Sequence, residues 1–374
     1  MKRLLTIFFF YIFSNTLLYG YTSPRFYSLE NLAKGNSDIV FFNNRYGMYY
    51  NPALMDGSDQ IFYLTLTDIG FAFERSFLDF SEFVLTNLLN FKRFTSNPEY
   101  INKSFQDKTG VFDMRYLHLG NYIEADIQAL GIGLGVWGYN NLAVSYDDGV
   151  YFPIVRVKGK MAYSSQISYG FRLLKQLSMG ISLRYWIYPQ DYAFISILDV
   201  VNKIEGDDST TLFKDTSGVF YQLENGSFDL KDYTHLSLDL GYIYYMKNIR
   251  IGFVIRDLVH VLSTDKVDKS FDIGFGYRFI ALEDFFDINR IIYTFSISDL
   301  TGDYALGKKI NTGMEVSWIP IGFMVGISQG YPTWGFFVRY VGVKVSFASY
   351  AEEEGDYPGV NELRTYRFGI MVGY

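Results

Sequence analysis

Apolar side chains recur at every second position over long stretches of this chain, and this period of two constrains the fold more than any other feature. In residues 177–187, one face carries Leu177, Met179, Ile181, Leu183, Tyr185 and Ile187. The other face carries Ser178, Gly180, Ser182, Arg184 and Trp186. Successive side chains of a strand point to opposite faces, so this segment predicts a β-strand with one apolar and one mainly small or polar face.

The same alternation returns in residues 167–173, 236–244, 249–256, 271–279, 291–298 and 341–347. A soluble β-sandwich also alternates, but its outer face is usually charged, whereas the second face here is rich in Gly and Ser with scattered Arg. Segments of about 8–11 residues suit tilted strands that cross the hydrocarbon layer of a membrane. We therefore predict an all-β transmembrane antiparallel barrel. The sequence allows about 12 to 16 strands, and we expect about 14, an even number as in other bacterial barrels.

The composition agrees with this prediction. The 374 residues include 35 Phe, 33 Tyr and 34 Gly, and the mean hydropathy is +0.05. Aromatic residues form girdles at both membrane interfaces of a barrel, and a polar lumen keeps the mean hydropathy near zero. The absence of Cys excludes disulfides, thiolate metal sites and cysteine nucleophiles. The acidic net charge of −7 argues against nucleic acid as a partner.

The first residues predict export. Lys2 and Arg3 precede an apolar run over residues 4–18, and Gly20 offers a small residue for cleavage. We expect a signal peptide over residues 1–20, with a retained anchor helix as the alternative. Loss of the two positive charges would change the formal net charge from −7 to −9. An exported chain without another long apolar run must enter a membrane as a barrel, which predicts the outer membrane.

Three stretches interrupt the alternation within the predicted barrel, residues 58–374. Residues 78–94 carry apolar side chains at helical spacing, which predicts a helical insertion. Residues 198–232 are polar and acidic and predict a long surface loop, and residues 351–363 predict an acidic connection between the last two strands. The chain has no internal repeat or linker, so we expect no second soluble domain.

The last strand resembles the assembly signal of outer-membrane proteins, in which a polar residue, a glycine, an apolar residue and a final aromatic residue stand at set positions. Arg367, Gly369, Val372 and Tyr374 match these positions. The resemblance implies recognition by the barrel-assembly machinery through strand pairing. The alternative is an ordinary final strand.

The sequence contains no pattern typical of catalysis. Its three histidines, His118, His235 and His260, have no spacing shared with another ligand, so we predict no catalytic residues, no metal, no cofactor and no enzyme activity. The inward face is basic, and Arg172, Arg184, Arg250 and Arg278 are candidates to bind the carboxylate or phosphate of a ligand. The alternative is that these arginines pair with carboxylates inside the barrel.

A motif before the first predicted strand resembles a known family. Gly35 is followed by aromatic residues and then by Asn51, Pro52 and Ala53. A glycine-containing N-terminal segment that leads to Asn-Pro-Ala is similar to the FadL family of hydrophobic-compound transporters and to the related PorV-type, TraF-like and spirochaete barrels. The resemblance implies a 14-stranded barrel in which residues 21–57 form an internal hatch, with Asn51, Pro52 and Ala53 as hatch positions. An ordinary turn before the first strand is the alternative.

Three functions remain open from the sequence. The first is a FadL-like channel for hydrophobic or amphipathic compounds such as long-chain fatty acids. The second is a PorV-like scaffold that binds secreted or surface proteins, and the third is a general diffusion porin. The expected partners are outer-membrane lipid, the barrel-assembly machinery, a hydrophobic small molecule and, for a scaffold, a secreted or surface protein.

Overall fold

A computed structural model describes most of the predicted barrel and part of the segment that precedes it. The described residues are 25–40, 46–56, 62–74, 117–147, 154–187, 190–196, 234–261, 267–302, 304–353, 357–360 and 362–373. The predicted signal peptide (1–20), the helical insertion (78–94), the long loop (198–232) and Tyr374 lie outside the described residues.

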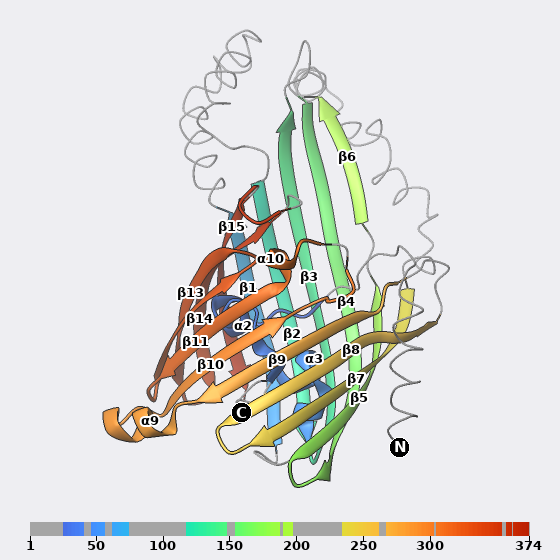
Figure 1. Ribbon diagram of the computed structural model, residues 1–374. Coiled ribbons are helices and arrows are strands. Elements are labelled where there is room, and N and C mark those ends of the chain that lie inside the picture. Colours follow the sequence, from blue (N-terminus) through green and yellow to red (C-terminus); the bar gives the residue numbers. More distant parts are fainter. Residues whose placement is uncertain are drawn as a thin grey trace.

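Fourteen antiparallel strands form a closed barrel, which confirms the predicted fold class (Figure 1). Around the ring the order follows the chain, from β1 to β5 and from β7 to β15, and pairing of β15 with β1 closes it. The additional strand β6 pairs only with β4, along its first residues, 154–160. A closed ring leaves no unpaired strand edge in lipid, which is why a barrel can span a membrane.

The elements have the following bounds. The strands are β1 (Phe62–Glu74), β2 (Leu117–Ala129), β3 (Ile132–Asp147), β4 (Ile154–Leu174), β5 (Leu177–Ile187), β6 (Gln190–Ser196), β7 (Thr234–Met246), β8 (Ile249–Val261), β9 (Ser270–Arg278), β10 (Arg290–Ile297), β11 (Ile310–Ser317), β12 (Ile321–Ser328), β13 (Tyr331–Tyr340), β14 (Val343–Glu353) and β15 (Glu362–Gly373). The helices are α2 (Leu29–Ala33), η1 (Asp38–Val40), α3 (Gly47–Tyr50), η3 (Pro52–Met55), α9 (Ile280–Phe286) and α10 (Leu306–Lys309).

The alternating sequence determines which side chains face outward. On β5, Ile181, Leu183 and Tyr185 are exposed on the outer face, whereas Ser182 and Arg184 are buried on the inner face. The other strands repeat this arrangement, so a band of exposed Ile, Leu, Val and Phe surrounds the barrel. This surface fits a location in an outer membrane. Among the described residues, no helix is both long and apolar enough to span a membrane.

The two ends of the barrel differ. At one end, strands are joined by short turns such as those at residues 130–131, 175–176, 247–248 and 341–342. Short turns face the periplasm in barrels of this kind, and longer loops face outward. Strands β3 and β4 extend beyond the opposite rim, where β6 pairs with β4 (Figure 1). The helix α9, which the sequence analysis did not predict, lies at the short-turn end.

Candidate functional site

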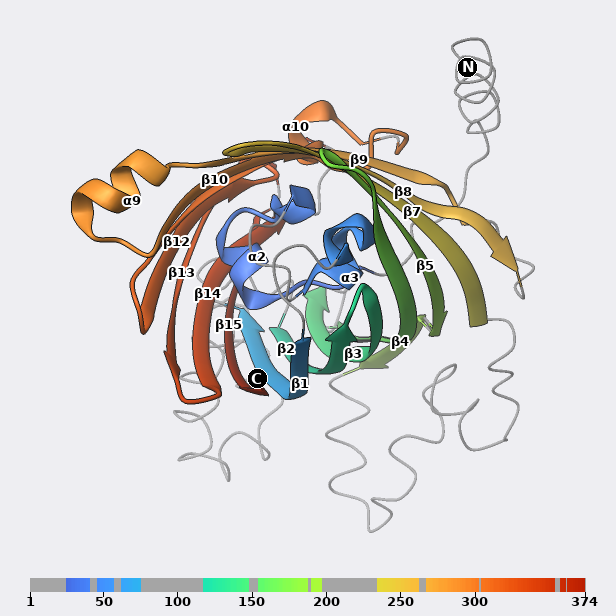
Figure 2. The same cartoon turned by 90° about the horizontal axis from the view of Figure 1, so that it is seen from below.

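The described part of the N-terminal segment lies inside the barrel (Figure 2). Almost every residue in 25–40 and 46–56 is buried. Helix α2 begins at Ser28, whose hydroxyl accepts a hydrogen bond from the Asn31 N–H at 3.1 Å, and the chain turns back after it at Gly35 and Asn36, both with positive φ. We call residues 25–40 and 46–56 the internal segment.

Asn51, Pro52 and Ala53 form one end of the internal segment, against strands β4, β5 and β7. The Asn51 side chain caps η3 by accepting from the Ala53 N–H at 3.1 Å, and its amide donates to the carbonyl oxygens of Ile39 and Tyr242, each at 3.2 Å. Pro52 occupies the first turn of η3, where its missing N–H costs no hydrogen bond. Asn51 thus joins two parts of the internal segment to the wall. The role of these three residues as a hatch remains a prediction.

A girdle of inward glycines accommodates the internal segment. A carbon atom added to Gly170 would lie 2.6 Å from the Pro52 carbonyl oxygen, and one added to Gly326 would lie 2.5 Å from the Gly35 nitrogen. Glycine in a strand interior permits this close approach of a second backbone. The girdle comprises Gly133, Gly135, Gly170, Gly180, Gly241, Gly252, Gly274, Gly313, Gly326, Gly335 and Gly369. Glycine on the inner face, such as Gly180, was expected from the alternation, but the backbone that these glycines contact was not.

Buried ion pairs connect the internal segment to one side of the wall. The Lys34 ammonium lies 3.0 Å from Asp38 Oδ2 and 3.1 Å from Glu315 Oε2 on β11. The Lys344 ammonium on β14 lies 2.6 Å from Glu30 Oε1 and donates to the Tyr46 hydroxyl at 3.0 Å. Charges removed from water are stable only when they are paired, so these contacts determine where the segment sits.

Arg256 on β8 also holds the internal segment. Its Nε lies 2.9 Å from Asp272 Oδ2, and its two terminal nitrogens donate to the carbonyl oxygens of Tyr49 (3.2 Å) and Tyr50 (2.8 Å). Arg25 lies 3.4 Å from the same Asp272 carboxylate. The pairing of Arg256 with α3 could not be predicted from the sequence, because these residues are about two hundred positions apart.

The four arginines predicted to bind a ligand all have protein partners in this structure. Arg172 pairs with Asp56 at 3.0 Å, and Arg184 pairs with Asp257 at 2.9 Å and with Asp239 at 3.5 Å. Arg250 lies over the Tyr245 ring at 5.2 Å, and Arg278 pairs with Glu283 of α9 at 2.9 Å. Arg172 and Arg184 thus have carboxylate partners of the kind that the alternative expects, whereas Arg250 contacts a ring and Arg278 pairs with α9 at the rim. A ligand role for these four arginines remains a prediction.

The predicted assembly-signal residues lie on β15 between β14 and β1. Arg367 points inward, donates to the Tyr27 carbonyl oxygen at 3.0 Å and lies over the Tyr122 ring at 4.2 Å. Gly369 faces Leu29 of α2, and Val372 faces outward. Arg367 and Gly369 therefore also contact the internal segment or its immediate neighbours. Recognition by an assembly machinery remains a prediction.

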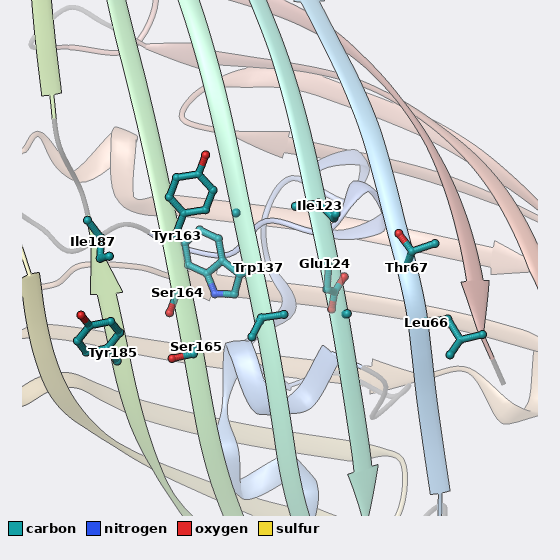
Figure 3. Close-up of a pocket in the computed structure, with 13 residues that line it drawn as sticks. Leu66, Thr67, Ile123, Glu124, Trp137, Tyr163, Ser164, Ser165, Tyr185 and Ile187 are labelled. Carbon is teal, nitrogen blue, oxygen red and sulfur yellow. The ribbon is translucent and has the colours of Figure 1, made fainter. Parts of the chain in front are cut away.

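A pocket of about 360 Å³ lies in the outer surface of the wall, across β1 to β5 (Figure 3). Its middle consists of the small residues Ala125, Gly138 and Ser165, on β2, β3 and β4, and the tyrosines Tyr163 and Tyr185 stand at its side. Pairing across the strands places Ala125 and Ser165 in one row and Gly138 and Tyr163 in the next. Small side chains between large ones therefore create the hollow.

An irregularity in the β1–β2 ladder borders this pocket. Thr65 pairs with Asp126 and Asp68 pairs with Glu124, so Leu66 and Thr67 together stand opposite Ala125. This extra residue is a bulge, which interrupts the hydrogen-bond ladder and redirects side chains. Leu66 and Thr67 both line the pocket. The wall is thus less regular at this position than at the β2–β3 and β3–β4 seams, which pair without interruption.

An aromatic cluster connects the pocket with the internal segment. Trp137 lines the pocket but points to the inner face, where it is buried with Phe26, Tyr49 and Tyr122. The Phe26 ring stacks on Tyr49 at 4.2 Å and lies 6.1 Å from the Trp137 ring. Trp137 therefore separates an apolar hollow on the lipid side from the aromatic contacts that hold the internal segment.

Together these features define an outer-membrane type of β-barrel with an occupied lumen and an apolar wall pocket. Comparisons with known proteins assign it to no family: no family model matches the chain, and no curated protein matches its sequence.

Solved barrels show weak likenesses. The toluene transporter TodX of Pseudomonas putida has 9% identity and a TM-score of 0.49, over 95% of this chain and 99% of TodX. CdiB from Acinetobacter baumannii has 8% identity and a TM-score of 0.37 over 71% of this chain, which spans only 52% of CdiB. A mutant of the Rh. blastica porin has 10% identity and a TM-score of 0.28, over 84% of this chain and 99% of the porin.

Proposed function

We propose that this protein is an outer-membrane channel that takes up small hydrophobic or amphipathic compounds, with long-chain fatty acids among the candidate cargoes. In this proposal the internal segment is the hatch. The observation that carries it is the position of Trp137, which lines the apolar wall pocket and also belongs to the aromatic cluster of the internal segment.

The pocket suits an apolar compound better than an ion. Its volume of about 360 Å³ lies in the usual range for small-molecule sites, about 300–1,000 Å³. Its outward lining is apolar apart from the hydroxyl groups of Thr67, Ser165 and the two tyrosines. A compound in this pocket would exchange with membrane lipid on one side. On the other side, movement of Trp137 would bring the compound into contact with Phe26 and Tyr49.

The occupied lumen favours a gated channel over a general diffusion porin. Buried ion pairs of Lys34 and Lys344 and the bonds of Arg256 fix the internal segment across the barrel. A porin instead needs an open aqueous path. Within the described residues, no observation specifically favours the alternative of a protein scaffold.

Filling the pocket tests this proposal. Ala125→Phe places a ring in the middle of the pocket, and Ile127→Phe adds a similar ring to the same outward face of β2 outside it. The purified full-length variants should be compared by native mass spectrometry and by uptake in cells, using a labelled long-chain fatty acid and a neutral monoaromatic compound as separate probes.

We expect Ala125→Phe to reduce binding and uptake of at least one probe while Ile127→Phe leaves both unchanged. The probe that is affected identifies the class of cargo. If both variants bind and transport both probes as the parent protein does, or if the parent protein binds neither probe, the proposed function is wrong.

A further inference from the structure

The helix α9 exposes a large apolar surface at the short-turn rim of the barrel. Phe285 is 79% exposed and Phe286 is 58% exposed, and Leu282 is also exposed. At about 100° of rotation per residue, Ala281, Leu282, Phe285 and Phe286 occupy one arc of about 140°. Glu283 and Asp284 lie on the other side of the helix, with the apolar Ile280 between them. The helix is therefore amphipathic, with an apolar face that contacts no other part of the described chain extensively enough to bury it.

The structure fixes the direction of this apolar face. Glu283 is buried, accepts a hydrogen bond from Arg278 Nε at 3.0 Å and accepts another from the Ile291 N–H at 2.7 Å. Ile291 belongs to the outward face of β10, yet it is only 4% exposed. Helix α9 thus contacts β10 at the rim, and the ribbon views show it projecting outward from the ring and not across the lumen (Figures 1 and 2).

A neighbouring turn extends the same surface. The Ile319 N–H donates to the side chain of Asn289 at 3.2 Å, which joins the β11–β12 turn to the segment after α9. This turn exposes Trp318 and Ile319, and β12 continues from it with the outward residues Ile321 and Phe323. We define the rim patch as Leu282, Phe285, Phe286, Trp318 and Ile319. It is continuous with the lipid-facing band of the wall.

We propose that the rim patch is inserted in the headgroup region of the periplasmic lipid leaflet and binds phospholipid. Trp is typical of membrane interfaces. Trp, Phe and Leu are typical of the apolar face of interfacial helices, which is buried by about 5–10 Å. Residues 278–290 carry Arg278 and Arg290 against Glu283, Asp284 and Asp287, a balance of −1. The insertion is therefore driven by apolar burial and does not require anionic lipid.

Fluorescence quenching tests this proposal. The chain contains no cysteine, so a single introduced cysteine can be labelled selectively. Phe286→Cys and, as a second apolar position, Phe285→Cys carry an environment-sensitive fluorophore in the full-length protein in phosphatidylcholine vesicles. Asp284→Cys is the matched control on the opposite arc, and Phe323→Cys is the lipid-facing reference on β12. Heat-modifiable migration shows that each variant is folded.

We expect lipids with a quencher near the headgroup to remove most of the fluorescence at positions 285 and 286, and aqueous iodide to remove little. Asp284→Cys should show the opposite preference, and addition of phosphatidylglycerol should leave the pattern unchanged. If labels at 285 and 286 are quenched by iodide as strongly as the label at 284, with no quenching by lipid, the patch faces water or a periplasmic protein and the proposal fails.

Discussion

Replacing Lys34 with methionine should release the internal segment from the wall. The Lys34 ammonium is fully buried and lies 3.0 Å from Asp38 Oδ2 and 3.1 Å from Glu315 Oε2. Methionine fills a similar volume without a charge. Glu315 retains its pair with Arg290, whereas Asp38 loses the cation beside it. Removing one partner of a buried pair costs roughly 3–5 kcal/mol, which corresponds to a fall of about two hundred- to five thousand-fold in the ratio of seated to released segment.

The effect of this substitution should depend on pH. Burial raises the pKa of Asp38 to about 7, although Lys34 opposes the increase. A carboxyl group with a raised pKa stabilises the seated state fully below its ordinary value of 3.8 and loses that contribution as the pH rises through about 7. Without Lys34 the pKa should rise further, because desolvation is no longer opposed. Lys34→Met should therefore release the segment more at pH 8 than at pH 5.

Single-channel recording in planar bilayers measures this release as opening events. Lys34→Met should open more often than the parent protein at pH 8, and Lys34→Met with Asp38→Asn should recover the closed state because no unpaired carboxylate remains. Lys308→Met is the control, since Lys308 of α10 lies over the Tyr304 ring, outside the internal segment. Equal opening of Lys34→Met and parent protein at pH 8, or no recovery in the double variant, would refute the reasoning.

Two further perturbations address the same contacts. Gly241→Val places carbon atoms against the Asn51 side chain, so it should destabilise the seated segment by about 1–3 kcal/mol and increase opening in bilayers, whereas unchanged gating would contradict the glycine girdle. Burial raises the pKa of Glu30, but Lys344 and nearby cations lower it more strongly, to about 2. The Glu30 contribution should therefore persist above pH 4.5 and disappear only as the pH falls through about 2, so Glu30→Gln should increase opening equally at pH 5 and pH 8. A Glu30→Gln effect present only at pH 8 would contradict this assignment.

The strand architecture could be predicted from the sequence, because whether a side chain points into the barrel or toward lipid depends only on a local period of two. Every residue of β5 faces as the alternation predicts, from Ser182 and Arg184 inside to Leu183 and Tyr185 outside. The alternation also indicated that inward arginines would need partners. It could not name those partners, because Arg184 and Asp257 become neighbours only through a bulge at Asp257, which has a positive φ.

The candidate site depends on register, which the sequence does not reveal. The wall pocket requires Ala125, Gly138 and Ser165 from three strands to lie in two adjacent rows of the sheet, and their alignment depends on turn lengths and on the bulge in β1. The glycine girdle depends on register in the same way, because glycines from many strands must lie at the same height in the barrel. Lys34 and Asp38 have helical i, i+4 spacing, which was a usable local signal, but their third partner Glu315 is 281 residues from Lys34.

Disulfide trapping between Ser37 and Thr294 tests the position of the internal segment most directly. The two buried hydroxyl oxygens lie 2.6 Å apart, and the parent chain has no cysteine. Cysteines at both positions should form an intramolecular disulfide in the outer membranes of intact cells after mild oxidation, because side chains this close can meet the geometric requirement of the bond. Cysteines at Ser37 and Ser165 should form none, since Ser165 faces outward. Failure of the first pair to cross-link in a folded, heat-modifiable barrel, or equal cross-linking of both pairs, would contradict the account.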